Sequence, residues 1–211
     1  MARKVEKGPS KSRWSVHPSV VMVQTWVDSL KQKTGRTLEE WIALIKQEGP
    51  PAEKERRDWL KKVHGLGTNS AWWLAERAEG KGTEADSAEA YLQEADRNVE
   101  AMFAGSKARL RPLFEELLKV GTALGTDVRV CPCKTIVPLY RKHVFAEIKP
   151  STQTRIDLGF ALGDTAPTRR LIATGGLEKG DRITLRVAIT SLKDIDEQVK
   201  GWLRKAYDRD A

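Results

Sequence analysis

The hydrophobic pattern of this chain changes its period near residue 124, and this change restricts the fold more than any other feature. Before it, apolar side chains recur at the three- and four-residue spacing of amphipathic helices. After it they alternate, as in Arg155 to Leu162 and Arg182 to Ile189, where every second residue is apolar. A last helical pattern, Leu192 to Tyr207, follows. Helices, then a mainly antiparallel sheet, then a helix predict an α+β fold.

We expect residues 16–79 to form a small all-α module of four short helices. Pro18 suits the first turn of the first helix, and Gly35 suits its end. The sequence Thr37-Leu38-Glu39-Glu40 predicts a capping box for the second helix, and Gly49-Pro50-Pro51 ends that helix. The tryptophans of this part are most simply core residues, although Trp72 and Trp73 could instead be exposed for stacking.

A glycine turn joins the third and fourth helices of this module. Gly65 and Gly67 break the helix that ends near Val63, and Thr68 or Asn69 can cap the next one. Such a turn leaves backbone N–H groups free at a helix start, where a phosphate can bind, and Lys61 and Lys62 lie just upstream. The pattern Gly-Leu-Gly-x-x-x-Ala-x-x-Leu resembles the helix-hairpin-helix motif, although His64 replaces a frequent proline. The alternative is a plain tight turn between packed helices.

Composition divides the rest of the chain. We expect residues 1–15 to form a disordered basic tail and residues 80–88 to form a linker. Residues 89–211 are expected to form the α+β domain. The 211 residues carry a net charge of +8. Residues 1–79 hold 15 basic and 10 acidic side chains, and residues 80–211 hold 22 and 19. The basic excess is therefore denser in the N-terminal module, which favours it as the part that binds anions.

Within the second domain we expect two helices, residues 87–103 and 110–124, before the sheet. The first strand candidate is Val128 to Cys131, which Thr135 to Tyr140 can extend past Pro132. The others are listed in chain order: Val144 to Lys149, Arg155 to Leu162, the short edge piece Leu171 to Ala173, and Arg182 to Ile189.

Nucleic-acid binding without enzymatic activity is the first functional hypothesis. The glycine turn would hold backbone phosphate, and basic residues on the polar sheet face would add contacts that give affinity without sequence reading. These residues are Arg129, Lys134, Arg141, Lys142, Arg155, Arg182 and Arg186. The competing interpretation is that they are ordinary solvent-facing positions of a one-sided sheet.

Two other functional classes stay open. A pocket between the sheet and the last helix, walled by Tyr140, Phe145, Trp202 and Tyr207, could bind a small molecule or protein. A metal-dependent nuclease is the third hypothesis, because Asp127 and Glu147-Ile148-Lys149 have the acid, acid-x-lysine order of restriction-type nucleases. It requires the two carboxylates to converge on a divalent ion.

Several classes find no support in the sequence. No apolar run reaches the length of a membrane span, and the N-terminus lacks the apolar core of a signal peptide, so we expect a cytoplasmic protein. Cys131 and Cys133 are expected to be reduced structural thiols. We predict no catalytic residue, metal or cofactor. The oligomeric state is left open.

The chain also resembles known families. The segments Lys33 to Thr37, Trp59-Leu60-Lys61 and His64 to Gly67 with Ala71 resemble domain of unknown function 4287 over about residues 20–78. The segments Thr135-Ile136-Val137 and Val144 to Pro150, with the ending Ile195 to Tyr207, resemble domain of unknown function 5655. That ending is also similar to the YdhG and YjbR families, which are often labelled as DNA-binding. The resemblance implies two domains and a bacterial source, and it implies no established activity.

Overall fold

The computed structural model describes residues 12–83 and 86–211. The chain divides into two compact units, one of residues 16–91 and one of residues 92–211 with residues 12–15. The division falls inside helix α5 (Ala88–Met102), whereas the sequence predicts a linker at residues 80–88. Residues 84 and 85 of that stretch, and residues 1–11 of the predicted tail, lie outside the described residues.

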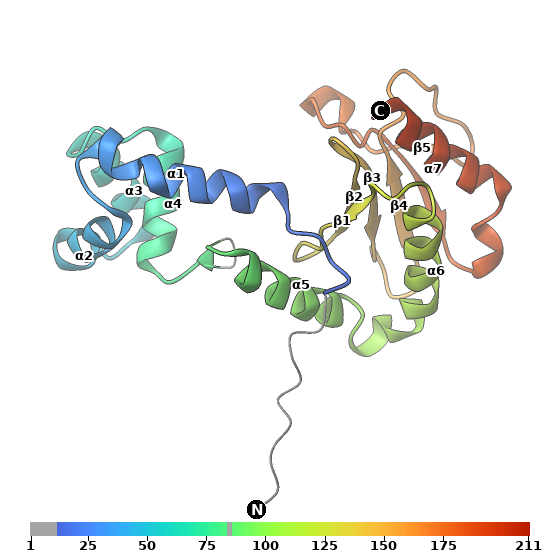
Figure 1. The fold of residues 1–211 in the computed structure, drawn as a ribbon, viewed down its shortest axis with the longest axis horizontal. Helices are drawn as coiled ribbons and strands as arrows, with labels where there is room; N and C mark the ends of the chain where they lie inside the picture. Colours follow the sequence, from blue (N-terminus) through green and yellow to red (C-terminus); the bar gives the residue numbers. More distant parts are fainter. Residues whose placement is uncertain (1–11, 84–85) are drawn as a thin grey trace, which may run out of the picture. The chain divides into compact units, whose positions relative to one another are not determined.

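The first unit contains the four predicted helices (Figure 1). They are α1 (Pro18–Thr34), α2 (Leu38–Glu48), α3 (Glu53–Lys62) and α4 (Thr68–Ala78). Gly35 ends α1 in the left-handed conformation at a φ of 80°. The capping box of α2 is confirmed, because the Thr37 hydroxyl accepts the Glu40 N–H at 3.2 Å and the Thr37 N–H donates to the Glu40 carboxylate at 2.7 Å.

The core of this unit draws at least one apolar side chain from each of its helices and from the α3–α4 turn. Its buried members are Leu30, Trp41, Ile45, Leu60, Leu66, Ala71, Leu74 and Ala75. Trp41 is buried and its indole N–H donates to the Thr34 hydroxyl at 2.8 Å, which satisfies its one polar atom. The turn between α3 and α4 is thus anchored to the core through Leu66.

The second unit is the α+β domain that the periodicity predicts. Its sheet has six strands, and every strand pair is antiparallel in the order β1-β2-β3-β4-β6-β5. The strands are β1 (Arg129–Val130), β2 (Val137–Tyr140), β3 (Val144–Lys149), β4 (Ile156–Phe160), β5 (Ile172–Ala173) and β6 (Leu185–Ile189). The predicted edge position of β5 is confirmed.

Helices α6 (Arg111–Thr122) and α7 (Glu197–Arg209) lie on one face of this sheet (Figure 1). Leu139, Ala146 and Phe160 are in register and face these helices. Gly121 of α6 approaches Leu139 closely, and Trp202 of α7 lies with its ring 6.1 Å from that of Phe160. The residues that alternate with these along each strand form the opposite face of the sheet. This face is more polar, as expected for an antiparallel sheet that is covered on one side.

Two details of the expected elements are wrong. Residues 135–140 do not extend the first strand past Pro132, because β2 turns back and pairs with β1 through Arg129 opposite Tyr140. The Cys133 N–H donates to the Ile136 carbonyl at 2.9 Å, and this bond closes the turn between the two strands. The last helix begins at Glu197 rather than near Leu192, because Asp196 caps it by accepting the Val199 N–H at 3.0 Å.

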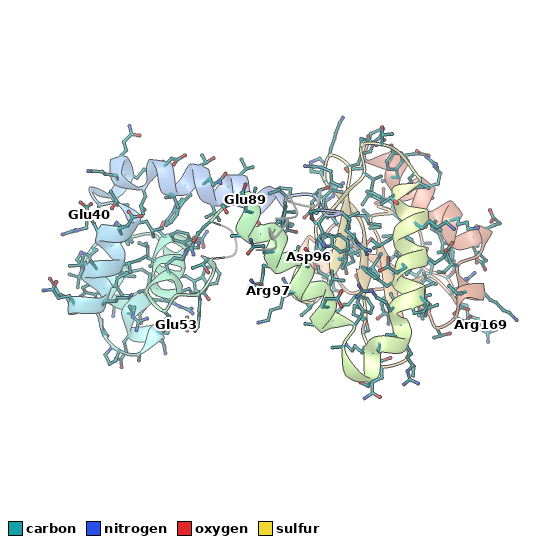
Figure 2. All side chains as sticks on the ribbon, turned by 60° about the horizontal axis from the view of Figure 1, so that its bottom comes forward. Glu40, Glu53, Glu89, Asp96, Arg97 and Arg169 are labelled. Atoms are coloured by element: carbon teal, nitrogen blue, oxygen red, sulfur yellow. The ribbon has the colours of Figure 1, made fainter. Side chains whose placement is uncertain are left out.

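The last residues of the predicted tail belong to the second unit. Trp14 is buried, and its indole N–H donates to Asp96 of α5 at 2.6 Å. Asp96 is labelled on α5 in Figure 2. The Ser15 N–H donates to the Val130 carbonyl at 2.8 Å, beside β1. A single large aromatic residue in a basic stretch is the sequence signal for this packing.

Candidate nucleic-acid interface

The turn between α3 and α4 is closed by backbone hydrogen bonds and one left-handed glycine. Gly65 has a φ of 65°, which side chains other than glycine rarely tolerate. Its N–H donates to the Lys61 carbonyl at 3.1 Å, and the Leu66 N–H donates to the Leu60 carbonyl at 3.2 Å. These bonds satisfy the last carbonyls of α3 and fix the direction in which the chain enters α4.

The start of α4 differs from the prediction. Neither Thr68 nor Asn69 caps this helix, because Gly67 occupies the N-cap position with extended backbone and Thr68 is already helical. Gly67 has no side chain to offer, and no described residue caps the helix with a side-chain hydrogen bond. The first helical bond runs from the Ala71 N–H to the Gly67 carbonyl at 2.9 Å. The N–H groups of residues 68–70 therefore precede the first helical hydrogen bond, and Thr68 and Asn69 are exposed.

The two lysines beside the turn are not equivalent. Lys61 forms an ion pair with Asp58 at 2.9 Å, and this hydrogen bond and charge lower the pKa of Asp58. Lys62 is exposed and lies one residue closer to the turn. The positive charge available near α4 therefore comes chiefly from Lys62 and from the helix start itself.

The aromatic residues around the turn have separate roles. His64 packs edge-on against Trp59 and Trp41, with ring centres 4.4 Å and 5.3 Å away, so it ties the turn to the core. Trp73 packs against Trp26 at 4.1 Å. Trp72 instead is 44% exposed, one helical turn after Thr68. Of the two tryptophans considered for stacking, Trp72 is therefore the accessible one.

The basic residues predicted on the sheet do not form one continuous charged face. Arg155 and Arg186 both pair with Asp157, at 2.9 Å and 3.0 Å. Arg141 pairs with Asp127 at 2.8 Å. Arg182 pairs with the buried carboxylate of Asp210 at 2.9 Å, and Arg129 donates to the Arg141 carbonyl at 2.9 Å. Lys134 and Lys142 are exposed. The structure thus joins Arg155 with Arg186 through Asp157, joins Arg129 to the backbone of Arg141, and pairs Arg182 with Asp210.

The two carboxylates of the nuclease hypothesis have different surroundings. Asp127 accepts hydrogen bonds from the Tyr207 hydroxyl at 2.6 Å and from Arg141 at 2.8 Å, and these bonds lower its pKa. Glu147 lies on β3 opposite Gly159, and burial raises its pKa. Among the described residues, no group of three or more histidine, cysteine or acidic side chains is placed to hold a metal ion.

Other candidate reactive groups are engaged in the fold. Burial raises the pKa of Cys131 to about 12 and also raises that of Cys133, so both thiols are protonated at neutral pH. The two cysteines are free, as expected. His143 shares a hydrogen bond of 2.9 Å with Asp210 through its Nδ1 atom. No helix within the described residues is long and apolar enough to cross a membrane.

A cavity lies at a place that the sequence hypotheses did not include. It has a volume of about 610 Å³ and opens between the end of α5, the loop before β2 and the end of β3. Lys107, Lys134 and Lys149 line it. None of the four residues expected to wall a pocket between the sheet and the last helix lines this cavity. Two of them, Phe145 and Tyr207, pack against each other with ring centres 5.6 Å apart.

Comparison with known families gives the chain a place among proteins of unknown function. The model of the domain of unknown function DUF5655 matches residues 99–210, which is more than half of the chain. The chain belongs to the DUF5655 family. The model of a second domain of unknown function, DUF4287, matches residues 22–80. Both resemblances predicted from the sequence are confirmed. Comparisons with curated proteins and with solved structures find no match.

The DUF5655 domain holds the lysine cavity, and the DUF4287 region holds the glycine turn. Sequence reasoning named Lys134 but missed Lys107 for any binding role, and it considered Lys149 only as a nuclease residue. Lys107 and Lys149 are separated by 42 positions in the sequence. No local spacing signals that such residues share a cavity, because the approach of α5 to the sheet brings them together.

Proposed function

We propose that the turn between α3 and α4 binds phosphates of the nucleic-acid backbone, weakly and without reading the base sequence. The observation that carries this proposal is the exposed start of α4, where Gly67 supplies no capping side chain. The N–H groups of a helix start and the aligned helix dipole favour an anion at this position. A phosphate oxygen would accept the hydrogen bonds that a capping serine or aspartate accepts in other helices.

Two side chains near this start support a nucleic-acid ligand over a free anion. Lys62 is exposed and can neutralise a second phosphate. Trp72 lies four residues after Thr68, and helical side chains lean toward the N-terminus of their helix, so its exposed ring lies near the same turn. An unpaired base can stack on such a ring. We therefore infer a preference for single-stranded over duplex nucleic acid.

The expected affinity is modest because few charges take part. Non-specific binding of this kind has dissociation constants of about 1–100 µM, and two or three phosphate contacts give a shallow salt dependence. Four arginines of the sheet, Arg141, Arg155, Arg182 and Arg186, are not included in this site, because Asp127, Asp157 and Asp210 already pair with them.

The test compares two double variants of equal charge change. Lys61→Glu with Lys62→Glu places negative charge beside the turn, and Lys46→Glu with Lys54→Glu makes the same change at exposed positions of α2 and α3. Fluorescence anisotropy with a labelled single-stranded oligonucleotide at about 50 mM salt measures the affinity. We expect at least about a tenfold loss in the first variant and a smaller loss in the second.

Circular dichroism must show equal helicity in the three proteins. Equal affinities of the two double variants would show that only net charge matters, and this would contradict the proposal. Absence of binding by the unmodified protein would contradict it as well.

A further inference from the structure

The cavity of the DUF5655 domain is lined by three lysines from three different elements. Lys107 comes from the 3-10 helix Gly105–Leu110, Lys134 from the loop before β2, and Lys149 from the end of β3. The lining residues are all described and include no aspartate or glutamate. Lys134 and Lys149 are exposed, so their ammonium groups can reorient toward a ligand at little cost.

Lys107 is held in place by the backbone. Its ammonium group donates to the Pro150 carbonyl at 2.6 Å, across the cavity edge. An ammonium group has three donors, and this bond uses one of them. The bond fixes one positive charge at the cavity wall, and the two other lysines lie on the opposite side of the lining from α5. Lys107 therefore brings a held positive charge to the same hollow that Lys134 and Lys149 line.

Two carboxylates in the sheet near Lys149, those of Asp157 and Glu147, are not part of the cavity lining. Asp157 already pairs with Arg155 and Arg186, and it accepts the Ser151 hydroxyl at 2.7 Å. Burial raises the pKa of Glu147, and the charge of Lys149 only partly opposes this rise.

The rest of the cavity wall combines apolar residues with the polar side chains of Asn98, Ser106, Thr135 and Ser151. Ala101, Met102 and Ala104 contribute from the end of α5 and the residues after it, and Pro150 closes the other side. A volume of about 610 Å³ is within the range of pockets that hold small organic molecules, and it is larger than a bare phosphate needs. The flexible Met102 side chain can adapt to a flat ring.

We propose that this cavity binds a small molecule in which a phosphomonoester is attached to an apolar or aromatic group. The phosphate lies among the ammonium groups of Lys107, Lys134 and Lys149, and the apolar group lies against Met102 and Pro150. A doubly charged phosphate forms charge-assisted hydrogen bonds with several lysines at once, which a neutral ligand cannot do. This site is independent of the α3–α4 turn and goes beyond the nucleic-acid function.

The experiment uses the full chain and phenyl phosphate, the simplest probe with both features. Titration followed by two-dimensional ¹H–¹⁵N NMR should give saturable shifts at the amides of Ser106, Lys134, Thr135, Lys149 and Ser151. The amides of residues 65–69 should not move, which separates this site from the turn. Phenol and inorganic phosphate are the two comparison ligands, and each should bind at least about tenfold more weakly because it lacks one half of the contacts.

The matched variants are Lys134→Ala with Lys149→Ala, and Lys119→Ala with Lys193→Ala at exposed positions elsewhere in the same domain. We expect the first pair to weaken phenyl phosphate binding at least about tenfold and the second to leave it unchanged. The proposal is overturned by the absence of saturable shifts at about 10 mM probe, a typical weak-ligand limit. It is also overturned by shifts confined to other residues, by equal affinities of the two variants, or by equal binding of inorganic phosphate.

Discussion

The α3–α4 turn and the open face of the sheet present positive charge in opposite ways. At the turn, the groups that we propose to attract an anion are backbone N–H groups and Lys62, and no side chain of the described residues caps the start of α4. On the sheet, Arg155 and Arg186 converge on one carboxylate of Asp157, so their charge is used within the fold. Formal charge is therefore a poor guide to binding. The decisive property is whether a cation or N–H group already has an internal partner.

The largest effect that this comparison predicts is at Asp157. Its side chain is 13% exposed and pairs with two arginines, so Asp157→Ala leaves both guanidinium groups without their acceptor. We expect a loss of about 2–3 kcal/mol in the free energy of unfolding, because breaking a largely buried ion pair strands the remaining charge. The same change should lengthen retention on a heparin column. Urea denaturation and salt-gradient elution measure the two effects.

The matched control is Asp58→Ala at the turn. Asp58 pairs with Lys61, but the two side chains are 42% and 38% exposed, and exposed pairs contribute little. The unfolding midpoint should stay where it is. If Asp58→Ala destabilised the protein as much as Asp157→Ala, the contrast between an open turn and a paired sheet would fail.

A second prediction concerns Asp210, which fixes the end of the chain to the sheet. Burial alone would raise its pKa, but the hydrogen bonds from the His143 N–H and imidazole and the charge of Arg182 together lower it. Because the folded pKa lies below the unfolded value, the carboxylate stabilises the fold above about pH 4, and this contribution disappears as the pH falls through the folded pKa.

Asp210→Asn should therefore reduce the free energy of unfolding by about 1–2 kcal/mol at pH 7. The difference from the unmodified protein should shrink as the pH falls from about 4 toward 2. Urea denaturation across this range measures it. A difference that stays constant with pH would mean that the side chain acts through packing and not through its charge.

The sequence predicts elements well where short-range chemistry decides them. Thr37 and Glu40 form the expected capping box, Gly35 ends α1, and β3 has the predicted bounds Val144–Lys149. Prediction from the sequence fails where two neighbouring residues could each take the same structural role. Asn69 is a better capping residue than glycine and Thr68 an equally good one, but Gly67 is the N-cap because the bonds of Gly65 and Leu66 to α3 set where α4 can start.

The candidate sites show the same limit. The turn can be found from glycine spacing, because its geometry depends on neighbours in the sequence. Whether an arginine is free to bind a ligand cannot be found from the sequence, because its partner is distant in the chain. Arg182 pairs with Asp210, and Arg141 pairs with Asp127. The lysine cavity likewise depends on Lys107 reaching Pro150, a contact that only the tertiary packing of the DUF5655 domain creates.

A third prediction separates the two glycines of the turn. An added Cβ meets no atom within 4 Å at either Gly65 or Gly67, so steric space does not distinguish them. Their backbones do, because Gly65 has a φ of 65° and Gly67 a φ of −65°. Gly65→Ala should cost about 1–2 kcal/mol, and Gly67→Ala should change stability by less than about 0.5 kcal/mol. Thermal unfolding of the two variants measures this. Equal losses would show that the turn adopts another conformation in solution.

The last prediction concerns Gly67→Ser, which has the smallest expected effect on stability and tests whether the turn binds phosphate or is only structural. In Gly67→Ser the backbone keeps an extended conformation that serine accepts, and its hydroxyl can accept the N–H of Asn69 or Ser70. The helix should gain only about a few tenths of a kcal/mol, since serine caps slightly better than glycine at this position. The same hydroxyl occupies the N–H groups that we propose for phosphate, so the affinity for single-stranded nucleic acid should fall although the protein is more stable.

Gly67→Ala, which adds a methyl group without an acceptor, is the control, and its affinity should fall less. Thermal unfolding and anisotropy titrations on the same samples measure both quantities. If Gly67→Ser gained stability and kept full affinity, the start of α4 would be only a structural turn, and the positive charge of the module would have to act elsewhere.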